Sequence, residues 1–171
     1  IIQDYRKRVD DPRIQILKQK NKGSHATINL GMTLANTPFI AILNSDDIYL
    51  PTRLSELMAI ATEARNPVFI VTGAILIDEN SRDITTLHWW QAMYRDIVSR
   101  WDGFVAAQVE NPAVHTLLWG NFTISTSNFF MSRTVWEQIG AFKHLRYVPD
   151  WDYALRVAAE MPNSFIFKPE K

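Results

Sequence analysis

Apolar residues occur along the chain in short runs separated by polar turns that contain Pro, Gly, Asn or Asp. The run at 39–43 is continuous and the run at 68–76 nearly so, as expected for strands buried on both faces of a sheet. Between them, 52–64 has the length and spacing of a helix, and Pro51 suits the first helical turn. Helix and buried strand alternate, which predicts an α/β domain with a mainly parallel, Rossmann-like central sheet flanked by helices.

The same pattern predicts further elements on both sides of this unit. A turn signal at 21–24 precedes a helix expected at 26–35, and apolar residues spaced three and four apart between 90 and 105 indicate an amphipathic helix. The other expected elements are helices at 1–9, 132–140 and 150–160 and strands at 14–17, 122–131 and 165–167.

Composition narrows the class of protein. The 171 residues are 47% hydrophobic and 21% charged, which fits one packed domain over 1–171. The chain begins with Ile rather than Met and reads like the interior of a helix, so we expect a domain truncated at both ends. Lys plus Arg (18) equals Asp plus Glu (18), and this balance argues against a nucleic-acid partner.

The absence of cysteine excludes disulfides and thiolate metal sites and agrees with a cytoplasmic location. No apolar run approaches the roughly 20 residues of a membrane helix, so no membrane span is expected within this segment. The alternative location is the inner face of the membrane.

Two acidic residues follow the most apolar run. Asp46 and Asp47 come directly after 39–43, where ligands of open α/β sheets bind. Two carboxylates at this place suit a hard divalent cation that bridges the phosphates of a diphosphate substrate. The alternative is that the pair only forms a turn and caps the next helix.

The residues around this pair resemble family 2 glycosyltransferases. The resemblance rests on Asn21-Lys22-Gly23, then Asn29-Leu30-Gly31, then Asn44-Ser45-Asp46-Asp47, followed by Pro51 and Arg53-Leu54, in the order and spacing of that family. It implies a GT-A fold, a nucleotide-diphosphate sugar as donor, and Mn²⁺ or Mg²⁺ held by Asp46 and Asp47. Asn44 stands where the family motif usually has its first acidic residue, and it brings no charge to a metal.

The resemblance extends to a second acidic block at 150–156. Asp150 matches the family's general base, which removes the proton of the acceptor hydroxyl, and Pro149 stands where a Glu is usual. The alternative is that Asp150 only caps its helix. Asn21 and Gly23 are expected to shape a loop near the nucleotide, with plain turn formation as the alternative.

The resemblance therefore implies an inverting transfer of sugar from a UDP- or GDP-type donor to the hydroxyl of a glycan, lipid carrier or other acceptor, in polysaccharide or cell-surface glycan synthesis. It also implies that the first strand of the domain and its C-terminal end lie outside this segment. Two alternatives stay open: a nucleotidyltransferase of similar topology, and a degenerate sugar-nucleotide-binding module without catalysis.

Overall fold

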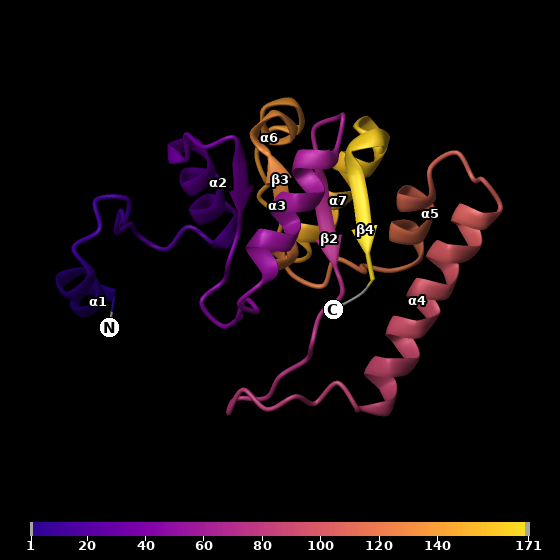
Figure 1. Cartoon of the computed structure of the whole chain (residues 1–171), viewed down its shortest axis with the longest axis horizontal. Helices are drawn as coiled ribbons and strands as arrows, with labels where there is room; N and C mark the ends of the chain where they lie inside the picture. Colours follow the sequence, from indigo (N-terminus) through magenta and orange to yellow (C-terminus); the bar gives the residue numbers. More distant parts are fainter. Residues whose placement is uncertain (1, 170–171) are drawn as a thin grey trace.

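The structure, a computed structural model, describes residues 2–169, and these are arranged around a four-stranded sheet of order β1-β3-β2-β4 (Figure 1). The strands are β1 (Phe39–Ala41), β2 (Phe69–Thr72), β3 (Phe130–Ser132) and β4 (Phe165–Lys168). The longer helices are α2 (Ser24–Leu34), α3 (Arg53–Glu63), α4 (His88–Ala106), α5 (Pro112–Trp119) and α7 (Pro149–Glu160). The shorter ones are α1 (Ile2–Val9), α6 (Arg133–Ile139) and the 3₁₀ turns η1 (Thr126–Asn128) and η2 (Pro162–Ser164).

The sheet is mixed. β3 pairs antiparallel with both β1 and β2, whereas β2 and β4 are parallel, so β3 alone runs against the other strands. The α/β class with helices around a sheet is confirmed, but the expected mainly parallel pairing is corrected at β3. The segment before β3 already lies at the carboxyl ends of β1 and β2, where Asn128 bonds Thr72. A strand that starts at this edge of the sheet must run antiparallel to β1 and β2.

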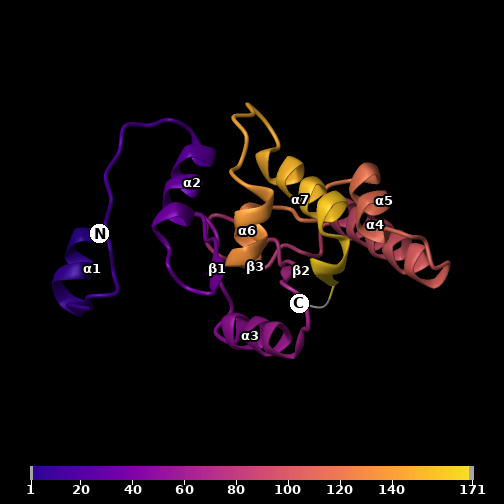
Figure 2. The same cartoon turned by 90° about the horizontal axis from the view of Figure 1, so that it is seen from above.

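Helices cover both faces of the sheet (Figure 2). Alternation along the strands sends neighbouring side chains to opposite faces. Ile70 and Phe130 therefore pack with Leu57 of α3, while Phe69 and Met131 pack with residues of α6 and α7 on the other face. In both views α1 lies apart from the sheet.

A cluster of aromatic rings attaches α7 to the sheet. Tyr153 stacks on Phe142 with ring centroids 4.1 Å apart, and Phe69 meets Phe129 edge-on at 4.8 Å. Tyr153 is fully buried. Since a buried aromatic side chain contributes roughly 1.5–3 kcal/mol, this cluster holds the first turn of α7 in place.

Most expected elements are present with small shifts, and four differ, one of them the strand expected at 68–76, which ends at Thr72. The helices expected at 26–35, 52–64 and 150–160 are confirmed as α2, α3 and α7. Residues 14–17 form no strand, because no described strand lies beside them. The strand expected at 122–131 is confined to β3, and the one expected at 39–43 ends at Ala41. Among the described residues, no helix is both long and apolar enough to cross a membrane.

Candidate functional site

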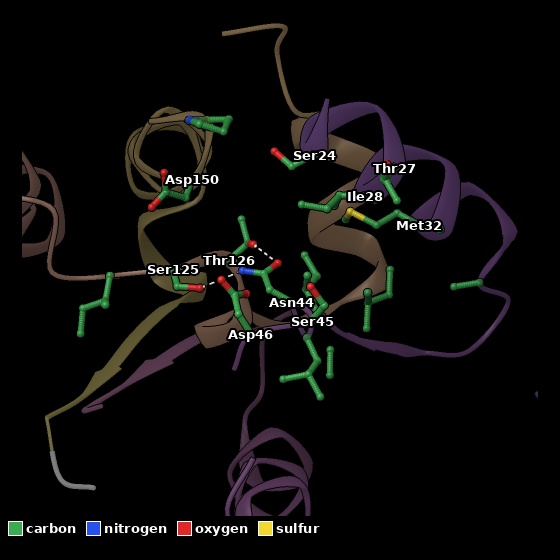
Figure 3. Close-up of a pocket in the computed structure, with 18 residues that line it drawn as sticks. Ser24, Thr27, Ile28, Met32, Asn44, Ser45, Asp46, Ser125, Thr126 and Asp150 are labelled. Atoms are coloured by element: carbon green, nitrogen blue, oxygen red, sulfur yellow. Dashed lines mark hydrogen bonds between the residues drawn. The ribbon is translucent and has the colours of Figure 1, made fainter. Parts of the chain in front are cut away.

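A cleft of about 890 Å³ opens between α2, the end of β1 and the start of α7 (Figure 3). One wall is the face of α2 that carries Thr27, Ile28, Gly31 and Met32. The floor is the chain from Ile40 to Asp46, and the opposite wall is built from 124–126 together with Pro149 and Asp150. The cleft thus lies at the carboxyl end of β1, where open α/β sheets bind their ligands.

The acidic pair after β1 splits into two different environments. Asp46 lines the cleft, is exposed, and has no hydrogen bond or ion pair with any other described residue. Asp47 does not line the cleft, and its carboxylate accepts hydrogen bonds from Ser125 Oγ at 3.0 Å and Asn44 Nδ2 at 3.4 Å. Asp46 is therefore the carboxylate available to a ligand, and Asp47 ties the turn to the segment before β3.

Asn44 forms hydrogen bonds with this same segment through both its side chain and its backbone. Its Nδ2 donates to Ser125 Oγ at 3.0 Å and its Oδ1 accepts from Thr126 Oγ1 at 3.0 Å. Its backbone N–H donates to Ser127 Oγ at 2.7 Å. An acidic side chain could not make the donating bond, so Asn44 serves the attachment of the acidic turn.

Asp150 reaches the cleft from the first turn of α7. Val148 has the left-handed φ of 52°, which is rare for a β-branched residue, and Pro149 then fixes the start of the helix. The half-buried carboxylate accepts a hydrogen bond from Asn121 Nδ2 at Oδ2, 2.9 Å away. Asp152 instead forms ion pairs with Arg156 and Lys143 and does not line the cleft.

Asn21 and Gly23 lie outside the cleft lining. Asn21 Oδ1 accepts from Gly23 N at 2.9 Å, and Gly23, with φ 88°, precedes α2 as its N-cap. The positive φ of Gly23 is strained for any residue with a β-carbon, which would also lie 2.7 Å from the His25 ring, so the turn favours glycine there. These two residues form the turn that starts α2, and the adjacent Ser24 is the one that lines the cleft.

The segment before β3 contributes residues that sequence reasoning missed. Ile124, Ser125 and Thr126 line the cleft, and Ile124 has a left-handed φ of 68°. Left-handed β-branched residues are costly and gather at functional sites. The signal in the sequence was the polar run from Thr123 to Asn128, which does not alternate as a half-buried strand should.

A polar network supports the floor of the cleft. Arg53 of α3 donates from Nη1 to Thr72 Oγ1 at 2.7 Å and from Nη2 to Asn128 Oδ1 at 3.0 Å. Asn128 in turn donates to the Thr72 carbonyl at 2.8 Å. Tyr49 donates its hydroxyl to the Ile42 carbonyl, and burial raises the pKa of this phenol, which keeps the donor protonated. The ends of β1 and β2 and the start of β3 are thereby joined.

The side chains of the cleft fit a cation shared with a substrate better than one enclosed by protein. No group of three or more His, Cys, Asp or Glu side chains that could hold a metal occurs in the described part of the chain. Mg²⁺ and similar ions are, however, often bound through one or two carboxylates together with substrate phosphates. The exposed, unbonded Asp46 carboxylate suits that arrangement.

Comparisons with known proteins match most of the chain to one family. The family model described as glycosyl transferase family 2 matches residues 1–140, a range that includes Asp46 but not Asp150. An uncharacterized glycosyltransferase of Rickettsia bellii is 33% identical over 78 residues, which cover 46% of this chain and 11% of that protein. An uncharacterized glycosyltransferase of Methanocaldococcus jannaschii is 35% identical over 81 residues, which cover 47% of this chain and 27% of that protein. The chain therefore matches only a minor part of the length of these relatives.

Proposed function

The chain belongs to glycosyl transferase family 2, and on that premise we propose that it transfers a sugar from a nucleotide-diphosphate donor of the UDP- or GDP-sugar type to an acceptor hydroxyl, with inversion at the anomeric carbon. The observation that carries the proposal is that Asp46 and Asp150, which come from different elements, face one cleft (Figure 3). The acceptor is a glycan, a lipid carrier or another hydroxyl compound, and the reaction belongs to polysaccharide or cell-surface glycan synthesis in the cytoplasm or at the inner face of the membrane.

The donor occupies the side of the cleft next to β1. A volume of about 890 Å³ lies within the range of small-molecule and cofactor sites. Asp46, with Asp47 beside it, would hold Mn²⁺ or Mg²⁺, which when bound neutralises charge on the diphosphate. The hydroxyls of Ser24, Ser125 and Thr126 border the cleft and are available to polar groups of the donor.

The acceptor hydroxyl approaches from the side of α7. As the acceptor oxygen forms its bond to the anomeric carbon, the bond from that carbon to the diphosphate oxygen breaks, and the nucleoside diphosphate leaves with the electron pair. Asp150 takes the proton of the hydroxyl, which leaves the new glycosidic oxygen neutral. Attack on the face opposite the leaving group inverts the anomeric configuration.

The test is the substitution Asp150→Asn in the full-length protein, with release of free UDP or GDP from a panel of nucleotide sugars as the measurement. Asn keeps the shape but cannot take the proton, so turnover should fall by about 10²–10⁴ while donor binding survives. The matched control is Asp152→Asn, which breaks the ion pairs with Arg156 and Lys143 outside the cleft and should leave turnover close to normal. Near-normal turnover in Asp150→Asn would reduce Asp150 to a residue of the first helical turn.

A binding module without catalysis is the second candidate, and Asn44 favours it, since its amide replaces a charged group of the family motif and is already bonded within the protein. Such a module would bind a nucleotide sugar in calorimetry but release no nucleoside diphosphate with any acceptor. Membership of the glycosyltransferase family argues against the nucleotidyltransferase alternative.

A further inference from the structure

The carboxylate of Asp150 accepts a hydrogen bond from the side chain of Asn121. Asn121, two positions after the end of α5, donates from Nδ2 to Asp150 Oδ2 at 2.9 Å. Asp150 Oδ1 has no hydrogen bond with the described part of the chain. The carboxylate therefore presents one oxygen to Asn121 and keeps the other for the cleft that it lines.

The hydrogen bonds of the Asn121 amide determine which end of the amide is oxygen and which is nitrogen. Its Oδ1 accepts from the backbone N–H of Thr123 at 3.1 Å and from Thr123 Oγ1 at 2.6 Å. A backbone N–H can only donate, so the oxygen end of the amide must face Thr123 and the nitrogen end must face Asp150. Thr123 is fully buried, which makes this support rigid.

The same short segment also reaches the acidic turn. Ser125, four positions beyond Asn121, donates to Asp47 Oδ2 at 3.0 Å. Between them, Ile124 has a left-handed φ of 68°, which lets the chain present Asn121 to one site and Ser125 to the other. Residues 121–125 therefore link the two acidic sites of the cleft through side-chain hydrogen bonds.

From these contacts we propose that Asn121 is a positioning residue for the reaction: it holds Asp150 Oδ2 so that Oδ1 points at the acceptor hydroxyl. The inference rests on the proposed role of Asp150 as general base. A base must lie within hydrogen-bond reach of the proton that it removes, so a freely rotating carboxylate spends less time in the productive direction. Asn121 acts only through Asp150 and touches neither donor nor acceptor.

The experiment measures kcat and the KM for the donor in the full-length protein, from release of nucleoside diphosphate with the nucleotide sugar that wild type uses. Asn121→Ala should lower kcat roughly 10–100-fold, as loss of outer supporting contacts commonly does, with the KM for the donor unchanged. Asn121→Asp keeps the acceptor for Thr123 but sets a second carboxylate against Asp150, so its loss of kcat should be at least as large. In an Asp150→Asn background, Asn121→Ala should cause no further loss.

The matched control for structural damage is Asn111→Ala. Asn111 also makes two hydrogen bonds through its amide, to Val114 N at 3.1 Å and to the Ala158 carbonyl at 2.8 Å, but it does not line the cleft. Its variant should lose stability and keep kcat.

The outcomes separate the two ideas. Normal turnover in Asp150→Asn alone would overturn the role of Asp150 as base, and the inference with it. Lost turnover in Asp150→Asn, combined with normal kcat in both Asn121 variants, would overturn only the positioning role. An equal fall of kcat for Asn121→Ala in the wild-type and Asp150→Asn backgrounds would also overturn it, because Asn121 would then act independently of Asp150.

Discussion

At the scale of single residues, neighbouring carboxylates acquire different tasks from their surroundings. Asp46 is exposed on the cleft without a bond to the described chain, whereas the Asp47 carboxylate accepts from Ser125 and Asn44. A cation or a phosphate-bound water can reach the Asp46 carboxylate without breaking a protein hydrogen bond. Both hydrogen bonds to Asp47 end on Oδ2, so a ligand that uses Asp47 without breaking a protein contact is restricted to its Oδ1.

This difference predicts unequal effects of two isosteric substitutions. If the cleft binds a nucleoside diphosphate together with Mn²⁺, Asp46→Asn should abolish the enhancement of UDP or GDP binding by Mn²⁺. Asp47→Asn is the matched comparison and should weaken the enhancement less. Isothermal calorimetry with and without Mn²⁺ on the full-length protein measures both. Equal, metal-independent binding by wild type and Asp46→Asn would contradict the proposed cation site.

The sequence predicted Asp46 and Asp150 as cleft residues because each stands at the end of an element, and element ends can be recognised locally. It could not predict Ser125 or Asn121 in the same way. Their places beside Asp47 and Asp150 depend on β3 pairing antiparallel with β1 and β2, which are distant in the chain. Asn21 and Gly23 form the turn that their sequence indicates, and their expected place near the nucleotide stays a prediction, since the adjacent Ser24 lines the cleft.

At the scale of elements, α2 forms one wall of the cleft and contains a glycine where a helix would normally have a side chain. Gly31 lines the cleft, and a β-carbon built on it would meet no atom within 4 Å. Glycine inside a helix costs about 1 kcal/mol relative to alanine. Gly31 therefore makes α2 less stable than alanine would. In return, no side chain projects from this position into the cleft.

Gly31→Ala should accordingly raise the free energy of unfolding by roughly 0.5–1 kcal/mol and weaken binding of a nucleotide sugar, because its methyl group enters the cleft. The matched control is Gly103→Ala in α4. Gly103 likewise lies three residues before the last residue of its helix and has no atom within 4 Å of a built β-carbon, but it is not in the cleft. Denaturant unfolding should show a gain in both variants, and calorimetry a loss of binding in Gly31→Ala alone. Unchanged binding in Gly31→Ala would mean that the ligand does not contact this wall.

Two elements that sequence patterns missed or misplaced have different physical causes. α5 begins at Asn111-Pro112, in a part of the chain where no element was expected. Asn111 caps the helix through Val114 N, and Pro112 occupies the first turn, where its missing N–H is not needed. β3 is short because Thr126–Asn128 form η1, where Ser127 and Asn128 accept from the backbone N–H groups of Asn44, just after β1, and of Thr72 in β2. The start of α5 thus follows from local capping, whereas the length of β3 depends on tertiary hydrogen bonds.

At the scale of the whole molecule, one aromatic core joins the part that matches the family model to the part beyond it. The match ends at residue 140, yet Phe142 and Tyr153 complete the core that includes Phe69 and Phe129. Asn29 of α2 also bonds both the N–H and the carbonyl of Phe142, at 2.8 and 2.9 Å. The wall of the cleft that carries Asp150 is thus held by the same core as the rest of the domain.

The buried phenol of Tyr153 makes the stability of this core dependent on alkaline pH. Burial disfavours the charged phenolate and raises the pKa of Tyr153 in the folded state above its ordinary value of 10.0. Above pH 10 the unfolded chain loses this proton while the folded chain keeps it, so ionisation favours unfolding. The stability is fully present below about pH 10 and falls as pH rises towards the folded-state pKa, by about 1.4 kcal/mol per pH unit for one such group.

Tyr153→Phe should therefore flatten the fall of the unfolding free energy between pH 10 and pH 11.5, measured by denaturant titration at each pH. It should not remove the fall completely, because burial also raises the pKa of Tyr94 to about 12. At neutral pH the cost should be small, since the Tyr153 hydroxyl has only a weak contact, 3.7 Å to Met131 Sδ. Tyr147→Phe, at a side chain that is 69% exposed, is the matched control and should leave the alkaline decline as it is in wild type. Equal alkaline slopes in wild type and Tyr153→Phe would show that this ring reaches solvent before the protein unfolds, and that the core holding the start of α7 opens locally.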